Sequence, residues 1–152
     1  MTLTPFDNKW DARFLAMAQL VSTWSRDPST KVGAVIVRPN RTIAALGYNG
    51  FARGVDDTDT RLQNRDLRIA LTVHAEANAI LNAHERLNNC TLYTTFPPCA
   101  MCAGLAIQAG LARVVSEATI PRRWVENMEV ARVALKEGGV RADYVLTVKE
   151  SE

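Results

Sequence analysis

No stretch of this 152-residue chain comes near the roughly 20 consecutive apolar residues that a transmembrane helix requires. The first 14 residues carry charges where a secretory signal peptide would need an apolar run. A tail of like charge, an internal repeat and a low-complexity segment are also absent, and the net charge is only +2. We therefore expect a cytoplasmic protein that binds neither a membrane nor a nucleic acid and that acts on a small molecule.

Cysteine and histidine are scarce, since the chain has three cysteines and two histidines. An odd number of cysteines in a reducing compartment argues against a disulfide framework. Cys99 and Cys102 nevertheless stand three positions apart, a spacing that is typical of metal-binding or redox sites in such a compartment.

Length and composition fit a single domain over residues 1–152 with a sizeable core, because 47% of the residues are hydrophobic and 22% are charged. Apolar residues spaced three and four positions apart predict an amphipathic helix with one buried face over residues 10–24. These residues are Trp10, Phe14, Met17, Ala18, Val21 and Trp24.

The rest of the chain alternates between strand and helix patterns. Two apolar runs at 31–37 and 42–48 predict a hairpin, and the polar segment 49–68 predicts a long loop followed by a short helix. The remaining expected elements are helices over 74–87, 99–110 and 123–139 and strands over 90–96, 112–117 and 141–148. This order predicts an α/β fold of three α/β/α layers, in which a mixed five-stranded sheet has helices on both faces.

The segment PCAMC at residues 98–102 begins one of the predicted helices. Cys99 and Cys102 then lie at positions i and i+3, so both sulfurs leave the same first turn. The positive end of the helix dipole favours the thiolate forms that bind metals. Two thiolates supply half of a tetrahedral zinc site.

His74 is the better of the two histidines as a further ligand. It begins its own predicted helix, and two helices that follow neighbouring strands can begin at the same carboxyl edge of a sheet, where open α/β sheets bind ligands. His84 lies ten residues later, about 15 Å along the predicted helix and on a different face, so we assign it to the surface.

Cys90 would complete a closed, structural zinc site if it reached the other three groups. It begins a predicted strand whose six extended residues hold it roughly 20 Å from the far end, so we assign it to the core. Three protein ligands with an open fourth position are typical of catalytic zinc. A structural metal site and a redox dithiol are the weaker alternatives, because a dithiol alone leaves His74 and Glu76 unexplained.

Glu76 follows His74 by two residues and points away from the direction of that imidazole. It can therefore lie beside the metal without binding it. A carboxylate placed there can remove a proton from a metal-bound water and return it to a substrate nitrogen. A glutamate near a helix start otherwise serves only to interact favourably with the helix dipole, but the P-C-x-x-C motif favours the catalytic interpretation.

The combination of HAE at 74–76 with PCAMC at 98–102 resembles the signature of the zinc-dependent nucleobase deaminases. The segments RDPSTKVGAVIV, ALGYNGFARG, HAEANAI, CTLYTTFPPCAMCA and IQAGLARVV follow in the order and spacing of the deoxycytidylate (dCMP) deaminases, over about residues 8–146. The chain is therefore similar to the zinc-dependent cytidine and deoxycytidylate deaminase family.

This resemblance implies a cytidine-deaminase-like fold and the hydrolysis of dCMP to dUMP and ammonia. It implies that His74, Cys99 and Cys102 bind Zn²⁺, that a zinc-bound hydroxide attacks pyrimidine C4, and that Glu76 shuttles the proton to N3.

The resemblance also implies contacts to the base and sugar. Asn49 matches an asparagine of the family that contacts the sugar or the base, the alternative being a turn residue at the end of a hairpin strand. The backbone amide of Ala75 and a carbonyl near Phe96 or Pro97 are expected to bind the pyrimidine edge.

For a 5′-phosphate, the segment SRDPSTK is the first candidate. Its candidate ligands are Ser25, Arg26, Ser29 and Lys31, and a different loop adds Arg122 and Arg123.

The chain departs from the family at two places. The loop over 54–73 has neither cysteine nor a histidine, so a second metal site found in some members has no ligands here. The segment ATIPRRWVENMEV at 118–130 does not align with the tyrosine-bearing segment common in dCMP deaminases, which leaves the choice of substrate open.

Three alternatives to a dCMP deaminase remain. A tRNA adenosine deaminase shares the zinc motif but needs a basic surface that a net charge of +2 scarcely supplies. A deaminase of a free base, a nucleoside or a modified cytosine compound is closer. A zinc-stabilised binding module without catalysis is a different class, and the intact Glu76 argues against it.

Members of the family are often hexameric and controlled by dCTP and dTTP. By resemblance we expect a homo-oligomer, from dimer to hexamer, with these two nucleotides as allosteric effectors. Apolar groups exposed on the first helix or around Trp124 are the expected contacts between subunits.

Overall fold

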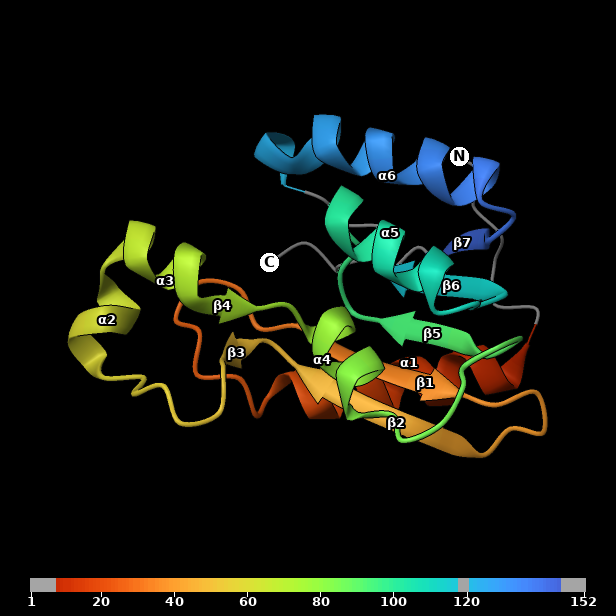
Figure 1. Ribbon diagram of the computed structural model, residues 1–152, viewed down its shortest axis with the longest axis horizontal. Helices are drawn as coiled ribbons and strands as arrows, with labels where there is room; N and C mark the ends of the chain where they lie inside the picture. Colours follow the sequence, from red (N-terminus) through yellow and green to blue (C-terminus); the bar gives the residue numbers. More distant parts are fainter. Residues whose placement is uncertain (1–7, 118–120, 146–152) are drawn as a thin grey trace, which may run out of the picture.

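A five-stranded sheet forms the middle layer of the computed structural model, which describes residues 8–117 and 121–145 (Figure 1). The strand order is β2-β1-β5-β6-β7. Strand β1 pairs antiparallel with both β2 and β5, whereas β5, β6 and β7 run parallel to one another. The strands are β1 Gly33–Val37, β2 Ile43–Tyr48, β5 Thr91–Thr94, β6 Arg113–Glu117 and β7 Arg141–Val145. The predicted mixed sheet is confirmed, although residues 146–148 of the last expected strand lie outside the described residues.

Helices cover both faces of this sheet, as the alternation of strand, hairpin and helix patterns predicts. Helix α1 (Lys9–Ser22) lies behind the sheet in Figure 1, whereas α4 (Ala75–Asn82) and α5 (Ala100–Gln108) lie in front of it. The structure has two hydrophobic cores, one on each face of the sheet. Helix α1 packs into one of them, and α6 (Val125–Glu137) packs into the other together with α4 and α5. Alternate residues of β1 point into the two cores, because side chains of a strand alternate between faces. None of the helices in the described ranges is long and apolar enough to cross a bilayer.

Helix α1 forms where the apolar spacing predicts it, but its C-terminal end comes before the end of the apolar pattern. Asn8 caps its first turn by accepting a hydrogen bond from the backbone of Trp10, and Phe14, Ala18 and Val21 are buried. The prediction that Trp24 belongs to the buried stripe is wrong, because the helix ends at Ser22 and the indole is 50% exposed.

The segment between β2 and α4 contains more regular structure than the sequence indicates. It has two short helices, α2 (Asp59–Gln63) and α3 (Arg65–Leu71), and a two-stranded sheet of β3 (Gly50–Phe51) and β4 (Thr72–Val73). Asn64 separates the helices, because its side chain caps α3. Strands of two residues are too short to show an alternating pattern. Figure 1 shows α2 and α3 beyond one end of the main sheet.

Helix α4 also ends earlier than the sequence predicts. Ala83 is extended, so His84 lies outside the helix rather than on its later turns, and the placement of His84 along that helix is wrong. The side chain of Asn82 donates a hydrogen bond to the carbonyl of Leu46 at 3.0 Å, which joins the helix end to β2. His84 is exposed and Cys90 is buried, as expected.

Helix α4 packs so closely on β2 that only glycine fits at position 47. A Cβ added to Gly47 would lie 2.4 Å from the backbone nitrogen of Ala79 and 2.6 Å from the carbonyl oxygen of Ala75. We therefore expect Gly47→Ala to destabilise the protein by about 1–3 kcal/mol. Calorimetry should show a Tm lower by about 2–4 °C for each kcal/mol.

Gly104→Ala is the matched control, since a Cβ there meets nothing within 4 Å. It should leave the Tm unchanged or raise it, because alanine favours helix more than glycine does. A wild-type Tm for Gly47→Ala would contradict the close packing of α4 on β2.

Candidate metal centre

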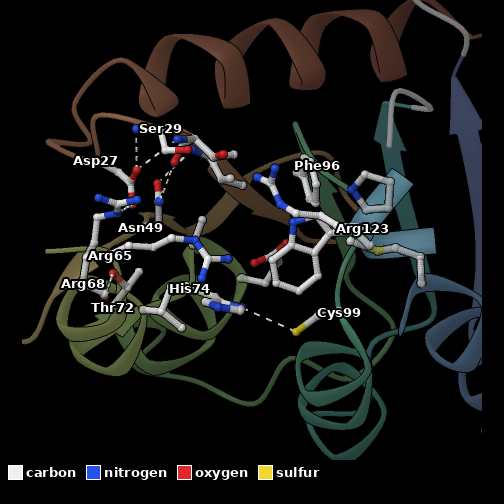
Figure 2. Close-up of a pocket in the computed structure, with 18 residues that line it drawn as sticks. Asp27, Ser29, Asn49, Arg65, Arg68, Thr72, His74, Phe96, Cys99 and Arg123 are labelled. Carbon is white, nitrogen blue, oxygen red and sulfur yellow. Dashed lines mark hydrogen bonds and ion pairs between the residues drawn. The ribbon is translucent and has the colours of Figure 1, made fainter. Parts of the chain in front are cut away.

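His74, Cys99 and Cys102 meet where α4 and α5 begin. His74 and Cys99 are the residues that immediately precede the two helices, and Cys102 lies in the first turn of α5. His74 Nδ1 is 3.5 Å from Cys99 Sγ and 3.4 Å from Cys102 Sγ. Figure 2 shows the imidazole facing the sulfur of Cys99. The sequence therefore identifies side chains that the fold brings together from positions 25 to 28 residues apart.

The spacing of these three groups fits zinc. Zinc binds nitrogen at about 2.0–2.1 Å and sulfur at about 2.3 Å, and tetrahedral angles then place the two ligand atoms about 3.5 Å apart. All three ligand atoms lie within 4.8 Å of one another, and within residues 8–117 and 121–145 no other group of histidine, cysteine and acidic side chains meets this criterion. Cys90 is buried in the hydrophobic core instead. The described residues therefore offer three ligands and leave a fourth position open.

The two cysteines differ in how readily each loses its proton. The hydrogen bond from Cys102, supported by His74, lowers the pKa of Cys99 to about 4. The same hydrogen bond raises the pKa of Cys102, which is also buried. The contact with Cys99 raises the pKa of His74. Metal binding is therefore coupled to loss of the Cys102 proton, since zinc requires thiolate ligands.

Glu76 lies in the first turn of α4 and lines a cleft beside the three ligands. Only 4% of this residue is exposed, and burial raises the pKa of its carboxyl group. The hydroxyl of Thr94 lies 3.3 Å from Glu76 Oε1 and 3.0 Å from the carbonyl oxygen of Phe96. A buried carboxyl group with a raised pKa is suited to accept a proton and to return it.

Several of the residues expected to bind substrate lie in this cleft. The expected residues that line it are Ser29, Asn49, Ala75, Phe96 and Pro97. Asn49 is buried and holds the opposite loop, because its Oδ1 accepts a hydrogen bond from the Val32 backbone and its Nδ2 donates one to the Thr30 carbonyl, both at 2.8 Å. Asn49 thus fixes one wall of the cleft as well as lining it.

Three of the four phosphate candidates in the segment SRDPSTK do not line the cleft. Ser25 is buried and donates a hydrogen bond to the carbonyl of Asn49 at 2.8 Å. Arg26 forms an ion pair with Asp57 at 2.7 Å, and Lys31 is exposed outside the lining. Of the four candidate residues in this segment, only Ser29 lines the cleft, so the segment mainly supports the cleft wall from behind.

The remaining walls come from segments whose role the sequence analysis missed. Helix α3 and strand β4 supply Arg65, Arg68, Ile69 and Thr72, and the turn η1 (Arg122–Trp124) with α6 supplies Arg123, Trp124 and Met128. Of these, only Arg123 was a candidate from the sequence. The available signal was the pair of arginines three positions apart after the helix-capping Asn64.

Comparison with known proteins agrees with this geometry. Residues 8–118 match the family model of the cytidine and deoxycytidylate deaminase zinc-binding region. A deaminase from the luxG 3′ region of Aliivibrio fischeri is 40% identical over 142 residues, which cover 91% of this chain and 95% of that protein. The probable deoxycytidylate deaminase of Caenorhabditis elegans is 43% identical over 112 residues, which cover 71% of this chain and 57% of that protein.

Among solved structures, the dCMP deaminase of cyanophage S-TIM5 in complex with dCMP and dUMP resembles this chain. The TM-score is 0.71 and the identity 26%, with 88% of this chain and 94% of that chain covered. The human deoxycytidylate deaminase is 36% identical over 113 residues, or 70% of this chain and 64% of that protein. The chain thus spans 57–64% of the human and nematode enzymes, and nearly all of the bacterial and phage proteins.

Proposed function

The chain belongs to the cytidine and deoxycytidylate deaminase family, and we propose that it hydrolyses dCMP to dUMP and ammonia. The family, its fold and its zinc cofactor, which the motifs indicate, are confirmed by the comparisons. The observation that carries the proposal is a three-ligand metal site with a buried carboxyl group beside it in one cleft. Deoxycytidylate deaminases at 36–43% identity support the choice of dCMP.

His74, Cys99 and Cys102 would hold the zinc ion, which would act as a Lewis acid and lower the pKa of a water molecule. Glu76 accepts the proton of that water and delivers it to N3 of the pyrimidine while the water oxygen joins C4. Glu76 then carries the proton of the new C4 hydroxyl to the amino nitrogen. The C4–N4 bond breaks, ammonia leaves and the uracil carbonyl forms, so water is the only co-substrate.

The cleft offers groups that hold the base while this happens. The backbone N–H of Ala75 lies in the first turn of α4, where amide groups have no partner within the helix and can bind a pyrimidine carbonyl. The ring of Phe96 and the buried Pro97 form an apolar wall that limits the access of water. Asn49 keeps the Thr30–Val32 segment in place and lines the cleft in which the sugar would lie.

Thr94 is expected to position Glu76. Thr94→Val removes the hydroxyl that contacts the Glu76 carboxyl group, and we expect kcat for dCMP to fall about 3–10-fold, the usual net contribution of one hydrogen bond. Thr94→Ser keeps the hydroxyl and should restore kcat to within about 2-fold of wild type. Steady-state ammonia release and zinc content are measured for both variants. A Thr94→Ser enzyme as slow as Thr94→Val would contradict the positioning role.

The substrate is tested by comparing ammonia release from dCMP, cytidine, cytosine, guanine and a tRNA anticodon stem-loop. We expect turnover of dCMP alone, and loss of that turnover in Glu76→Gln. Faster ammonia release from another of these compounds would make that compound the substrate and would leave the proposed zinc-dependent deamination mechanism unchanged. A zinc-loaded protein that turns over none of the five would favour the binding module.

We further propose, on the resemblance, that residues 1–152 act as one cytoplasmic deaminase domain and form a homo-oligomer regulated by dCTP and dTTP. Apolar side chains exposed on α1 and α5, such as Leu20 at 61% and Met101 at 73%, are available as subunit contacts. Trp124 instead is half-buried and lines the cleft. Light scattering with and without dTTP tests the assembly, and a monomer under both conditions would contradict it.

A further inference from the structure

We propose that Asn127 positions Cys99 for metal binding, because it holds the start of α5 from the neighbouring helix α6. The inference rests on the proposed function, since it concerns the same metal site. It adds a residue that is not one of the three ligands and does not line the cleft. The contact that carries it is a hydrogen bond from the backbone N–H of Ala100 to Asn127 Oδ1 at 2.9 Å.

The first turn of α5 lacks the usual cap from its own chain segment. Helices often begin with a serine, threonine, asparagine or aspartate whose side chain accepts a hydrogen bond from a free N–H group of the first turn. Cys99 occupies this position, but its side chain forms no such bond, and its sulfur lies 3.5 Å from His74 Nδ1. Asn127, which is 27 residues from Ala100 in the sequence, supplies an acceptor for one of these free N–H groups instead.

The peptide group between Cys99 and Ala100 is held at both of its polar atoms. Its carbonyl oxygen, which belongs to Cys99, accepts a hydrogen bond from the N–H of Ala103 at 2.8 Å. Its N–H group donates the bond to Asn127. A rotation of this peptide group changes the backbone angle ψ of Cys99, so the two bonds limit how far the sulfur can move relative to α5. Without Asn127, only the bond to Ala103 opposes that rotation.

Helix α6 is a firm support for this contact, because it packs along α5 (Figure 1). Asn127, in the first turn of α6, reaches the start of α5. Gly138, directly after α6, lies against Ile107 near the end of α5, since a Cβ added to Gly138 would be 2.8 Å from Ile107 Cδ1. Between these ends, Ala103 of α5 and Ala131 of α6 share one hydrophobic core. The position of Asn127 is therefore set by packing that does not depend on its own side chain.

The alternative is that Asn127 only stabilises the fold. Asn127 is exposed, and alanine favours helix more than asparagine does, which offsets part of the loss of the hydrogen bond in Asn127→Ala. The metal site is more sensitive, because a ligand that is already held in place loses less freedom when the ion binds. We therefore expect Asn127→Ala to weaken zinc binding while the metal-free fold changes little.

The experiment measures the Kd of zinc by competition with a chelator of known affinity, and the Tm of the metal-free proteins by calorimetry. We expect Asn127→Ala to raise the Kd of zinc about 3–10-fold, the usual net contribution of one hydrogen bond. Its metal-free Tm should stay within about 4 °C of the wild type. Asn127→Asp keeps an acceptor oxygen and should bind zinc within about 2-fold of the wild type or more tightly, since a negative charge is favourable at a helix start. Glu126→Ala, at an exposed position in the same turn, is the matched control and should leave the Kd within about 2-fold.

Two results would overturn the inference. One is an Asn127→Ala protein with the wild-type Kd for zinc, and a lower metal-free Tm beside that Kd would leave Asn127 a structural role only. The other is an Asn127→Asp protein that binds zinc as weakly as Asn127→Ala, because the acceptor oxygen would then not be responsible. The proposed function is judged separately by ammonia release from dCMP in the wild type. A wild type that deaminates dCMP while Asn127→Ala keeps its zinc affinity would retain its function and lose only this positioning role.

Discussion

Replacing Glu76 by glutamine should lower kcat for dCMP about 10²–10⁴-fold, the usual contribution of a general acid and base. Glutamine has nearly the same size as glutamate but cannot accept the proton of water or return it to N3 and to the leaving amine. Only 4% of Glu76 is exposed, so bulk water cannot easily replace its carboxyl group. The effect is expected on kcat more than on KM, because the group acts on the reacting atoms.

Zinc content separates this explanation from damage to the metal site. Glu76→Gln should retain one zinc per chain and a Tm close to that of the wild type, because His74, Cys99 and Cys102 are unchanged. Glu137→Gln, at an exposed position at the end of α6, is the control and should be fully active. An active, zinc-loaded Glu76→Gln enzyme would remove Glu76 from the mechanism.

Cys99→Ser should lose zinc and thermal stability together. Cys99 precedes α5 and His74 precedes α4, so the metal joins the beginnings of two helices that follow different strands. A ligand present at about 1,000 times its Kd stabilises the folded state by about 4 kcal/mol. At about 2–4 °C for each kcal/mol, we expect the Tm to fall by about 8–16 °C.

Metal analysis and calorimetry on the same samples test this coupling. Cys90→Ala also removes a cysteine sulfur, but from the hydrophobic core, and should keep the full zinc content. Treating the wild type with a chelator should lower its Tm to near that of Cys99→Ser. A Cys99→Ser protein with full zinc occupancy would show that this sulfur is not a ligand.

The metal site was predictable because its information is local. Cys99 and Cys102 are one helical turn apart, and His74 and Glu76 are two residues apart at another helix start, so helix geometry fixes each pair. Only the meeting of the two pairs required the fold. We expected the two helices to follow neighbouring strands, but β4, which precedes α4, belongs to the two-stranded sheet, whereas β5, which precedes α5, belongs to the main sheet.

The walls of the cleft were less predictable because they depend on contacts between distant segments. Arg65 lines the cleft from α3, a helix whose Arg68 forms an ion pair with the distant Asp27. Arg26 looks equivalent to Arg65 in the sequence, yet Asp57 pairs with it on another side. Which carboxylate an arginine pairs with depends on the tertiary fold and leaves no periodic pattern in the sequence.

Helix ends were a further source of error. Residues that favour helices continue past Asn82. Helix α4 nevertheless ends there, where the Asn82 side chain donates a hydrogen bond to β2 and the backbone of Ala83 is extended. The same is true of α1, whose apolar spacing continues to Trp24 although the helix ends at Ser22. Tertiary contacts override propensity at these positions.

A crystal structure of the zinc-loaded protein tests the central claim most directly. We expect one zinc ion bound by His74 Nδ1, Cys99 Sγ and Cys102 Sγ, with a water molecule as the fourth ligand within hydrogen-bonding distance of Glu76. A fourth protein side chain on the metal, or a zinc ion bound away from these three residues, would contradict the account.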